Sequence, residues 1–506
     1  MHDKNIKRII RNKLKHNFPN WNRLKRKTKK EIIREVKAEI SSNYDFEQEV
    51  TAPKEELLGI EQQAPTAGIL TLDDMSSFVE MINNNNVKKF CKYDGSAKAI
   101  KDDELRFIHE LIDDQIINRL LSYDGYSPAM RDIFPSNLFR AELLKAIQFP
   151  EISYRKFCKD KYMGLEQKEN RAFMGLSLRE KAIIDHTQLS HFRKSLTFVQ
   201  QVNLLVYILH HFMKSGLLAD NHLHAVDSTE LASDCKLPLA SFEINGQKIR
   251  IYNDIDCDCG KRRNKRDKSI YVIGYRLHTL TAIDPKTGLS FPLVSLLAPA
   301  NHHDSHFLPY LVNLAQAMGI DVKLVTADEA YHDKDGSLFE NTGATVVTPP
   351  SSKVSVPEHV NPETGVVLCH DQCSTPMLHL GVEEQIHEYK CGADAGECPH
   401  ANNCPQSRFI PLDSGMFQRI PYHLEQIQQV LDIRKNCERP FNLLKNQTGL
   451  ETLRVRSQHA TMARCTLASI AVLLIKMAGK RKKQVPEKSK QLSIVPAQTV
   501  LKRKVA

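Results

Sequence analysis

Apolar residues recur with a helical period through much of the first half of the chain. Between about residues 105 and 213, Ile108, Ile112 and Ile116 follow a period of 3.6, which places them on one face of a helix. Further helices are predicted over 135–149, where Pro150 stops the helix, and over 187–196 and 197–213. Residues 1–40 also have apolar positions with helical spacing. The pattern predicts a helical region of about 100 residues, which is the size of one domain.

From residue 222 onwards the pattern changes to short apolar runs that are typical of strands. Strands are predicted over 223–227, 269–283, 290–297, 322–327 and 344–348, with an amphipathic helix over 305–318. Three strands, a helix and further strands predict an α/β unit. Residues 350–425 contain Pro, Gly, His and Cys with little periodicity, and helix returns over 424–445 and 461–477.

Composition and the pattern of apolar residues argue against two classes, integral-membrane and secreted proteins. Of the 506 residues, 41% are hydrophobic and 26% are charged, as in ordinary soluble proteins. The longest apolar stretch, near 466–475, is too short to cross a bilayer. Asn, Lys and Arg crowd the first residues, where a signal peptide would have its apolar region. We therefore expect a cytoplasmic protein with no membrane partner, and its twelve Cys should be reduced thiols or metal ligands.

Basic residues are concentrated at the two ends of the chain. Residues 1–40 carry 14 Lys/Arg and 4 Asp/Glu, and residues 480–506 carry 9 Lys/Arg and 1 Asp/Glu. The body between them has a net charge of −8. Clustered cations of this kind suit a phosphate backbone, although frayed and solvated tails would have the same composition.

Two aspartates follow apolar runs, in Ala-Val-Asp227 and Val-Thr-Ala-Asp328. In an open α/β sheet, the carboxyl ends of strands face the functional crevice. Two carboxylates on neighbouring strands are ligands that suit Mg²⁺, although an Asp at a strand end also serves as a turn or helix cap. A third carboxylate, Glu438, lies four residues after Arg434 and seven before Lys445. On a continuous helix these three would form one stripe, which is either a site or a solvated ion-pair face, and Pro440 would interrupt it.

The order of these motifs resembles that of bacterial insertion-sequence transposases of the DDE class. Arg434, Glu438 and Lys445 match the spacing of the family's Tyr-x2-Arg-x3-Glu-x6-Lys box, with Leu431 in place of the Tyr. The other similar segments are Ala-Val-Asp227-Ser-Thr-Glu, Ile-Gly-Tyr-Arg-Leu-His278, Ala-Asn301-His-His-Asp304-Ser and Thr-Ala-Asp328-Glu-Ala-Tyr331. Upstream, Gly125-Tyr-Ser-Pro128 and the stretch from Asp185 to Arg193 resemble the family's N-terminal helical domain. The resemblance extends from about residue 105 to 480.

This resemblance implies an α/β fold with an RNase H-like catalytic core. It implies Asp227, Asp328 and Glu438 as a catalytic triad that holds two Mg²⁺ (or Mn²⁺) ions. Arg434 and Lys445 would contact phosphates. The partners would be double-stranded DNA, at the element ends and the target, and a second copy of the chain, in the bacterial cytoplasm at the nucleoid. Glu230 and Glu329 are read as outer carboxylates or solvated groups.

The expected domain organisation follows from the motifs and the changes of pattern. It comprises a basic N-terminal segment and linker (1–70), a helical DNA-binding domain (71–215), the first part of the RNase H-like core (220–350), a Cys-rich insertion (351–425), the final core helices (426–479) and a basic tail (480–506).

Two further segments have candidate chemistry. A loop between strands has five cations in the seven residues 260–266, and we expect them to contact DNA rather than only solvent: Lys261, Arg262, Arg263, Lys265 and Arg266. The insertion has five Cys, of which Cys373, Cys391, Cys398 and Cys404 would be the simplest ligands of a structural Zn²⁺, with Cys369 as a substitute. Buried or free thiols are the alternative.

Two other functions fit the same residues. A nuclease on this core would cleave DNA without joining it. A domesticated, non-catalytic protein would bind DNA without chemistry.

Overall fold

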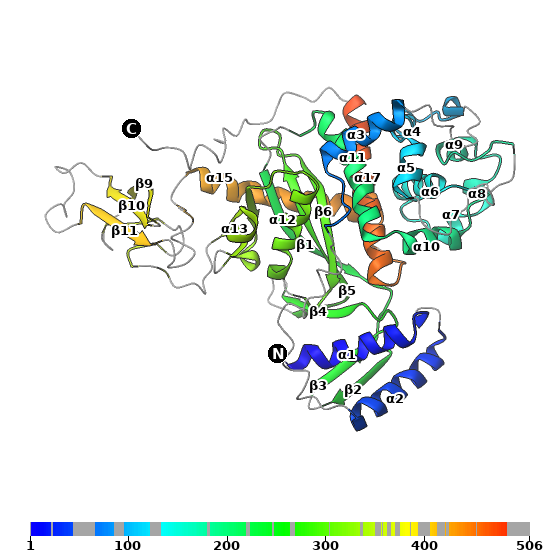
Figure 1. The fold of residues 1–506 in the computed structure, drawn as a ribbon, viewed down its shortest axis with the longest axis horizontal. Coiled ribbons are helices and arrows are strands. Elements are labelled where there is room, and N and C mark those ends of the chain that lie inside the picture. The colour runs from blue at the N-terminus through cyan, green and yellow to red at the C-terminus, as the bar shows by residue number, and fades with distance from the viewer. Residues whose placement is uncertain are drawn as a thin grey trace.

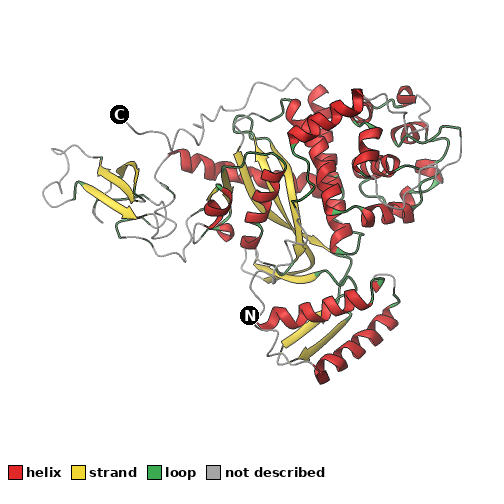
Figure 2. Cartoon of the chain, viewed as in Figure 1, coloured by secondary structure: helices red, strands yellow, loops and turns green. Residues whose placement is uncertain are grey.

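The computed structural model of the chain contains helices, a central sheet and two smaller sheets (Figures 1 and 2). It describes residues 2–21, 24–43, 66–84, 96–121, 133–179, 183–218, 223–244, 247–263, 269–302, 304–333, 337–349, 356, 358–361, 366–369, 375–384, 386–392, 405–411, 420, 422, 425–451 and 453–482. The predicted α/β class is confirmed, since helices pack around a sheet with both parallel and antiparallel strands.

The central sheet has the order β4-β5-β1-β7-β8, and β6 pairs with β5. Its strands are β1 (Leu223–Ala232), β4 (Asp258–Arg263), β5 (Ser269–Ile283), β6 (Ser290–Pro299), β7 (Leu324–Ala327) and β8 (Thr345–Val347). Strand β5 is antiparallel to β1, β4 and β6, whereas β1, β7 and β8 are mutually parallel. The strands predicted over 269–283, 290–297, 322–327 and 344–348 are therefore present, and β4 is an addition.

The two faces of the sheet pack against different helices. Val226, Leu280 and Val325 belong to the main core, which includes residues of α11 (Phe198–Lys214), α12 (Leu308–Ala317) and α17 (Gln458–Lys482). Ala225 and Ile283 point to the opposite face, because side chains alternate along a strand, and they pack against α15 (Glu425–Arg434). Figure 1 shows α17 between the sheet and the helical region.

The helical region precedes the sheet in the chain. Its elements are α3 (Leu72–Asn84), η4 (Ser96–Ala99), α4 (Asp103–Leu111), α5 (Asp114–Leu120), α6 (Pro135–Gln148), α7 (Tyr154–Phe157), α8 (Asp160–Met163), α9 (Lys168–Phe173), α10 (His186–Ser195) and α11. The periodic run after residue 105 is two helices rather than one. Asp113 caps α5 by accepting from the Gln115 amide at 2.7 Å. The buried Arg140 donates a hydrogen bond to the Ile112 carbonyl at 2.7 Å, which satisfies this carbonyl at the C-terminal end of α4.

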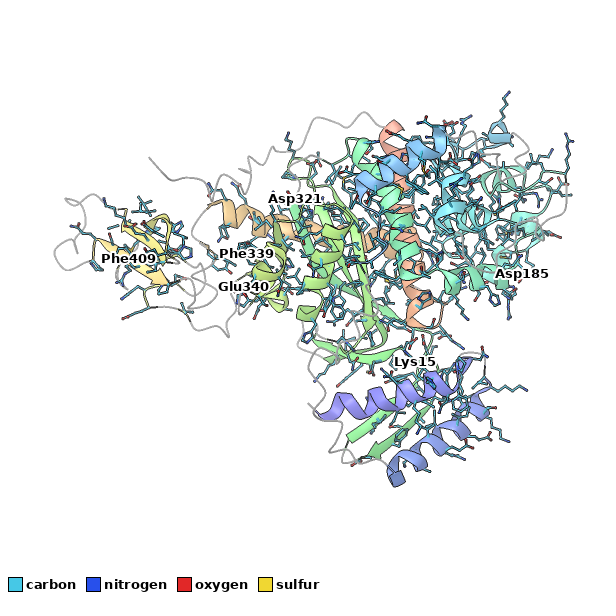
Figure 3. The ribbon with its side chains drawn as sticks, in the orientation of Figure 1. Lys15, Asp185, Asp321, Phe339, Glu340 and Phe409 are labelled. Carbon is cyan, nitrogen blue, oxygen red and sulfur yellow. The ribbon has the colours of Figure 1, made fainter. Side chains whose placement is uncertain are left out.

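The N-terminal residues form a small module with a hairpin from the middle of the chain. Helices α1 (His2–Asn17) and α2 (Arg26–Asn43) cover β2 (Ala240–Ile244) and β3 (Gln247–Ile251). Leu14, Trp21 and Ile33 are buried against Ile249 and Ile251. Arg11 pairs with Asp258 at 3.2 Å, and Lys15, labelled in Figure 3, pairs with Asp256. Much of the basic N-terminal segment is therefore folded and attached to the core.

The remaining elements complete the two sides of the sheet. They are η6 (Asp304–His306), η7 (Glu329–Tyr331), α13 (Ser337–Thr342), η9 (Lys435–Cys437), α16 (Glu438–Asn442) and the π-helical turn η10 (Leu443–Gln447). Among the described residues, one stretch, Gln458–Gly479, is long and apolar enough to cross a membrane, and 83% of it is buried inside the protein. It is the core helix α17.

The Cys-rich insertion contains a three-stranded antiparallel sheet, which the weak periodicity did not predict. Its strands are β9 (Met377–Glu383), β10 (Ile386–Cys391) and β11 (Ser407–Pro411). Phe409, labelled in Figure 3, is exposed on its surface. Cys373, Cys398 and Cys404 lie outside the described residues, whereas Cys369 is buried and Cys391 is half-buried. The zinc site stays a prediction.

Candidate active site

Asp227 and Asp328 lie side by side on two parallel strands of the central sheet. Their preceding residues, Val226 and Ala327, are register partners. Neighbouring strands are about 4.8 Å apart, so the two carboxylates start from adjacent backbone positions. Strand β7 ends at Ala327, as predicted. Strand β1 does not end at Asp227, because it stays paired with β5 as far as Ala232.

Local hydrogen bonds hold both carboxylates. The Ser228 amide donates to Asp227 Oδ1 at 2.7 Å. The Glu329 amide donates to Asp328 Oδ1 at 2.8 Å, so that Asp328 caps the turn η7. This is the capping role that an Asp after a strand often has, and it leaves the other oxygen of Asp328 exposed to solvent.

Burial raises the pKa of Asp227 to about 6. Hydrogen bonds from the Ser228 amide and the Cys437 thiol oppose this shift, the nearby Asp328 carboxylate adds to it, and the Arg434 cation opposes it. The pKa is raised because burial penalises the charged form of the carboxyl group, and nearby positive charge does not fully compensate for this penalty. Bringing a cation to Asp227 and Asp328 would therefore lower the pKa of Asp227.

The segment that carries Glu438 crosses the sheet at these two aspartates. Arg434 Nη1 lies 4.0 Å from Asp328 Oδ1, and the Cys437 thiol donates to Asp227 Oδ2 at 3.6 Å. The segment is not one regular α-helix, in agreement with the interruption expected from Pro440. Helix α15 ends at Arg434, a 3-10 turn follows, α16 begins at Glu438 and a π-helical turn contains Lys445. Pro440, which is buried in α16, lacks the amide that a continuous helix would need.

The predicted site residues are thus brought together in part. Asp227, Asp328 and Arg434 converge, and Glu438 follows directly on Cys437 with an exposed side chain. Lys445 Nζ lies 3.6 Å from Glu451 Oε2, with which it forms an ion pair. Within the described part of the chain, no three His, Cys, Asp or Glu side chains are grouped closely enough to hold a metal ion.

A buried polar network lies on the opposite face of β1, beneath Asp227. Ser228 Oγ donates to Asp304 Oδ1 at 3.0 Å, and Arg276 Nη1 donates to both carboxylate oxygens of Asp304 at 2.9 Å. His278 Nδ1 lies 3.2 Å from the Tyr331 hydroxyl, which also hydrogen-bonds Ser228. Tyr331 stands three residues after Asp328, so it ties the turn after Asp328 to the strand that carries Asp227.

Several residues of this network lie in the motifs noted in the sequence, which did not predict that they contact one another. Arg276, His278, Asp304 and Tyr331 all occur in the motifs that resemble the transposase family. Glu230 belongs to the same group, since its Oε1 lies 3.5 Å from Arg276 Nη2. Cys437 was missed altogether, because a single Cys beside Glu438 has no distinguishing pattern.

The predicted basic loop is partly a strand. Lys261, Arg262 and Arg263 belong to β4, which pairs with β5 in antiparallel register. Lys261 is exposed on this strand. Lys265 and Arg266 lie outside the described residues. The backbone of β4 pairs with the β-rich segment 269–274, so that these charged residues form a strand instead of a loop.

Comparison with known proteins adds no relative to this picture. No protein-family model matches the sequence, and a search of curated proteins finds no match either.

Proposed function

We propose that the chain is a DNA transposase of the DDE class, which cleaves the ends of an insertion sequence and joins them to target DNA with Mg²⁺. The observation that carries the proposal is the adjacency of Asp227 and Asp328 on parallel strands, with the Arg434–Glu438 segment against them.

The sheet supports an RNase H-like core as the finer fold. Strands β6, β5 and β1 are successive antiparallel neighbours, and β7 and β8 continue the sheet in parallel from β1. This arrangement of three antiparallel strands followed by two parallel ones is the one that the family resemblance implies. It places the first two acidic residues on β1 and directly after β7.

The residues present fit a divalent cation. Mg²⁺ is bound through one or two carboxylates together with waters and substrate phosphates, so that Asp227 and Asp328 suffice to hold it. When bound, the metal supplies Lewis-acid stabilisation of the attacking and leaving oxygens of an in-line displacement. Glu438 is the third carboxylate, at the start of α16 and next to Cys437. Its exposed side chain could turn toward the substrate or the metal.

The other residues of the site position the substrate. Arg434 presents a guanidinium beside Asp328, where its planar fork suits a phosphodiester of the DNA. Tyr331, Ser228 and Asp304 hold the two acidic strands in a fixed relationship. Lys261 and the exposed cations of α2 supply contacts to the phosphate backbone away from the reaction centre. Because two element ends are cleaved, we propose a dimer on DNA. The proposed location is the bacterial cytoplasm.

A strand-transfer assay tests the proposal and separates it from its rivals. The inverted repeats that flank the gene provide the end sequence for duplexes with a free 3′-hydroxyl, which are mixed with supercoiled plasmid and Mg²⁺. Joined products are the expected result. Nicking without joining would identify a nuclease, and binding without either reaction would identify a DNA-binding protein, so both outcomes would overturn the proposal.

A further inference from the structure

A small cavity at the junction of the helical region and the C-terminal core is lined by three basic side chains. It measures about 30 Å³ and lies between α6, the loop that follows it, and residues 449–464. Lys145 extends from α6, Arg464 from α17, and Arg454 from the segment between η10 and α17. Since one water needs about 10–15 Å³, the space accommodates about two waters or a group of similar size.

Two of these cations are buried. Lys145 is 3% exposed and Arg464 is 5% exposed, whereas Arg454 is at the solvent-exposed rim. Arg464 Nη2 donates to the Thr448 carbonyl. Its Nη1 is buried and has no hydrogen-bond partner among the residues that the structure describes. A buried guanidinium nitrogen without an acceptor is costly, so Arg464 Nη1 is a donor that an oxygen of a bound anion would satisfy.

The nearby carboxylates do not neutralise the three cations. Glu142, behind the cavity, is already paired with Arg193 and accepts a hydrogen bond from the Tyr154 hydroxyl at 2.7 Å. Glu151 lines the cavity, but it is exposed. Lys145 Nζ donates to the Pro150 carbonyl at 3.0 Å and lies 5.4 Å from the centre of the Tyr154 ring. The cavity therefore has an excess of positive charge.

The backbone beside the cavity is shaped by a glycine. Gly449 has φ of +71°, and a Cβ at this position would lie 2.6 Å from the Pro150 carbonyl oxygen. Only glycine allows the 449–455 segment to approach the loop after α6 so closely. This approach brings Arg454 and Arg464 to the same cavity as Lys145.

The lowered pKa of Lys145 agrees with an anion-binding role for this cavity. Burial, and then the Arg464 cation, lower the pKa of Lys145 to about 7. Glu142 opposes this shift, Arg454 adds to it, and Glu151 opposes it. An anion bound among the three cations would stabilise the charged lysine.

We infer that this cavity, together with the exposed rim at Arg454, binds a tetrahedral oxyanion of the phosphate type. Its inner oxygens would fill the cavity beside Lys145 and Arg464, and the rest of the group would lie toward Arg454. The oxyanion is either a phosphodiester of the DNA backbone or free inorganic phosphate, which share the same chemistry. The site consists of residues separate from Asp227, Asp328 and Glu438, so its existence does not depend on the proposed catalytic function.

Sulfate is the probe, because it does not titrate between pH 6 and 9. Its binding to the full-length protein is measured by calorimetry against chloride at equal ionic strength. Arg454→Ala removes an exposed lining cation without disturbing the core, and should weaken sulfate binding about tenfold or more. Lys145→Met should weaken it further and abolish its pH dependence. Arg155→Ala, which removes an exposed cation outside the cavity, should leave binding unchanged.

The pH dependence has a defined sign. Lys145 loses its proton as the pH rises through about 7, so wild-type affinity for sulfate should fall between pH 6 and pH 8.5. Circular dichroism of each variant checks that the protein is folded.

Binding of duplex DNA distinguishes the two sources. If Arg454→Ala lowers the slope of log K against log salt by about 0.9, the site holds a backbone phosphate. If the slope is unchanged while sulfate binding is lost, the site holds free phosphate. Either result upholds the oxyanion site. Sulfate affinity that is equal in the wild type, Arg454→Ala and Lys145→Met, or no better than that for chloride, would overturn it.

Discussion

The thiol of Cys437 donates a hydrogen bond to Asp227, with 3.6 Å between Sγ and Oδ2. The two residues are 210 positions apart in the chain, and Glu438 is the next residue after Cys437. This contact fixes where the segment with Glu438 meets the central sheet. It also stabilises the charged form of Asp227, because the thiol donates to the carboxylate.

Replacing Cys437 by Ala should raise the pKa of Asp227 further, since it removes a donor to the carboxylate. We expect the acidic limb of the pH profile of Mg²⁺-dependent nicking to move up by about 0.5–1 pH unit. Cys437→Ser keeps a donor and should move it less. A profile that is the same in the wild type and both variants would show that the contact does not influence Asp227.

The raised pKa of Asp227 predicts a pH-dependent stability. The folded protein binds this proton more tightly than the unfolded chain, so the resulting stabilisation is complete below pH 4 and is lost as the pH rises through about 6. Asp227→Asn should therefore be more stable than the wild type by about 1–2 kcal/mol at pH 8, and this gain should vanish below pH 4. Urea unfolding over this pH range measures the difference.

Glu340→Gln is the matched control for this measurement. Glu340 is exposed on α13, as its label in Figure 3 shows, and its replacement should leave the stability unchanged at every pH. A stability difference between Asp227→Asn and the wild type that does not vary with pH would contradict the assigned pKa.

Tyr331 should support the site through its hydroxyl. Tyr331→Phe leaves His278 and Ser228 without this partner, and we expect a loss of about 1–2 kcal/mol in stability together with slower nicking. Tyr422→Phe removes a similar buried hydroxyl, which donates to the Thr348 carbonyl at 2.6 Å in a different core. It should lose similar stability but keep its nicking rate. Equal nicking by both variants at a saturating Mg²⁺ concentration would assign Tyr331 a purely structural role.

The exposed face of α2 should contribute to DNA affinity. Arg26, Lys30 and Arg34 are exposed and lie on one stripe, whereas Lys29 is buried and bonds Asn253 Oδ1 at 2.7 Å. Lys30→Ala and Arg34→Ala should each lower the slope of log K against log salt by about 0.9 without affecting the fold. Deleting residues 1–40 is a poorer test, because it would also uncover Ile249 and Ile251. Unchanged slopes would mean that this face is only solvated.

Much of the fold could be predicted because its elements follow the rules of periodicity. Strands β5 and β6 are continuous β-rich runs, α11 is a long apolar helix, and α6 begins at Pro135 and ends before Pro150. The β2–β3 hairpin was missed although Asn245-Gly246, a strong turn signal, stands between alternating apolar residues. The polar end of β1 was missed because it is paired only through contacts distant in sequence.

The adjacency of Asp227 and Asp328 could be predicted, but the backbone geometry around Glu438 could not. Asp227 and Asp328 were expected as neighbours because both follow apolar runs, and the register confirms that they are. An interruption of the helix was expected at Pro440, but the sequence did not predict that a 3-10 turn would follow Arg434 or that a π-helical turn would begin at Leu443.

The proposed function requires Asp227, Asp328 and Glu438 to perform Mg²⁺-dependent chemistry on DNA. The most direct test is the nicking rate, with Mg²⁺, of a supercoiled plasmid that carries the gene's flanking repeats. Asp227→Asn, Asp328→Asn and Glu438→Gln should each lower the rate at least about 1,000-fold while DNA binding is retained, because the carboxylates serve the reaction rather than affinity. Glu329→Gln, which alters the exposed carboxylate next to Asp328, should nick at close to the wild-type rate. Wild-type nicking by the Asp328→Asn protein would contradict the account.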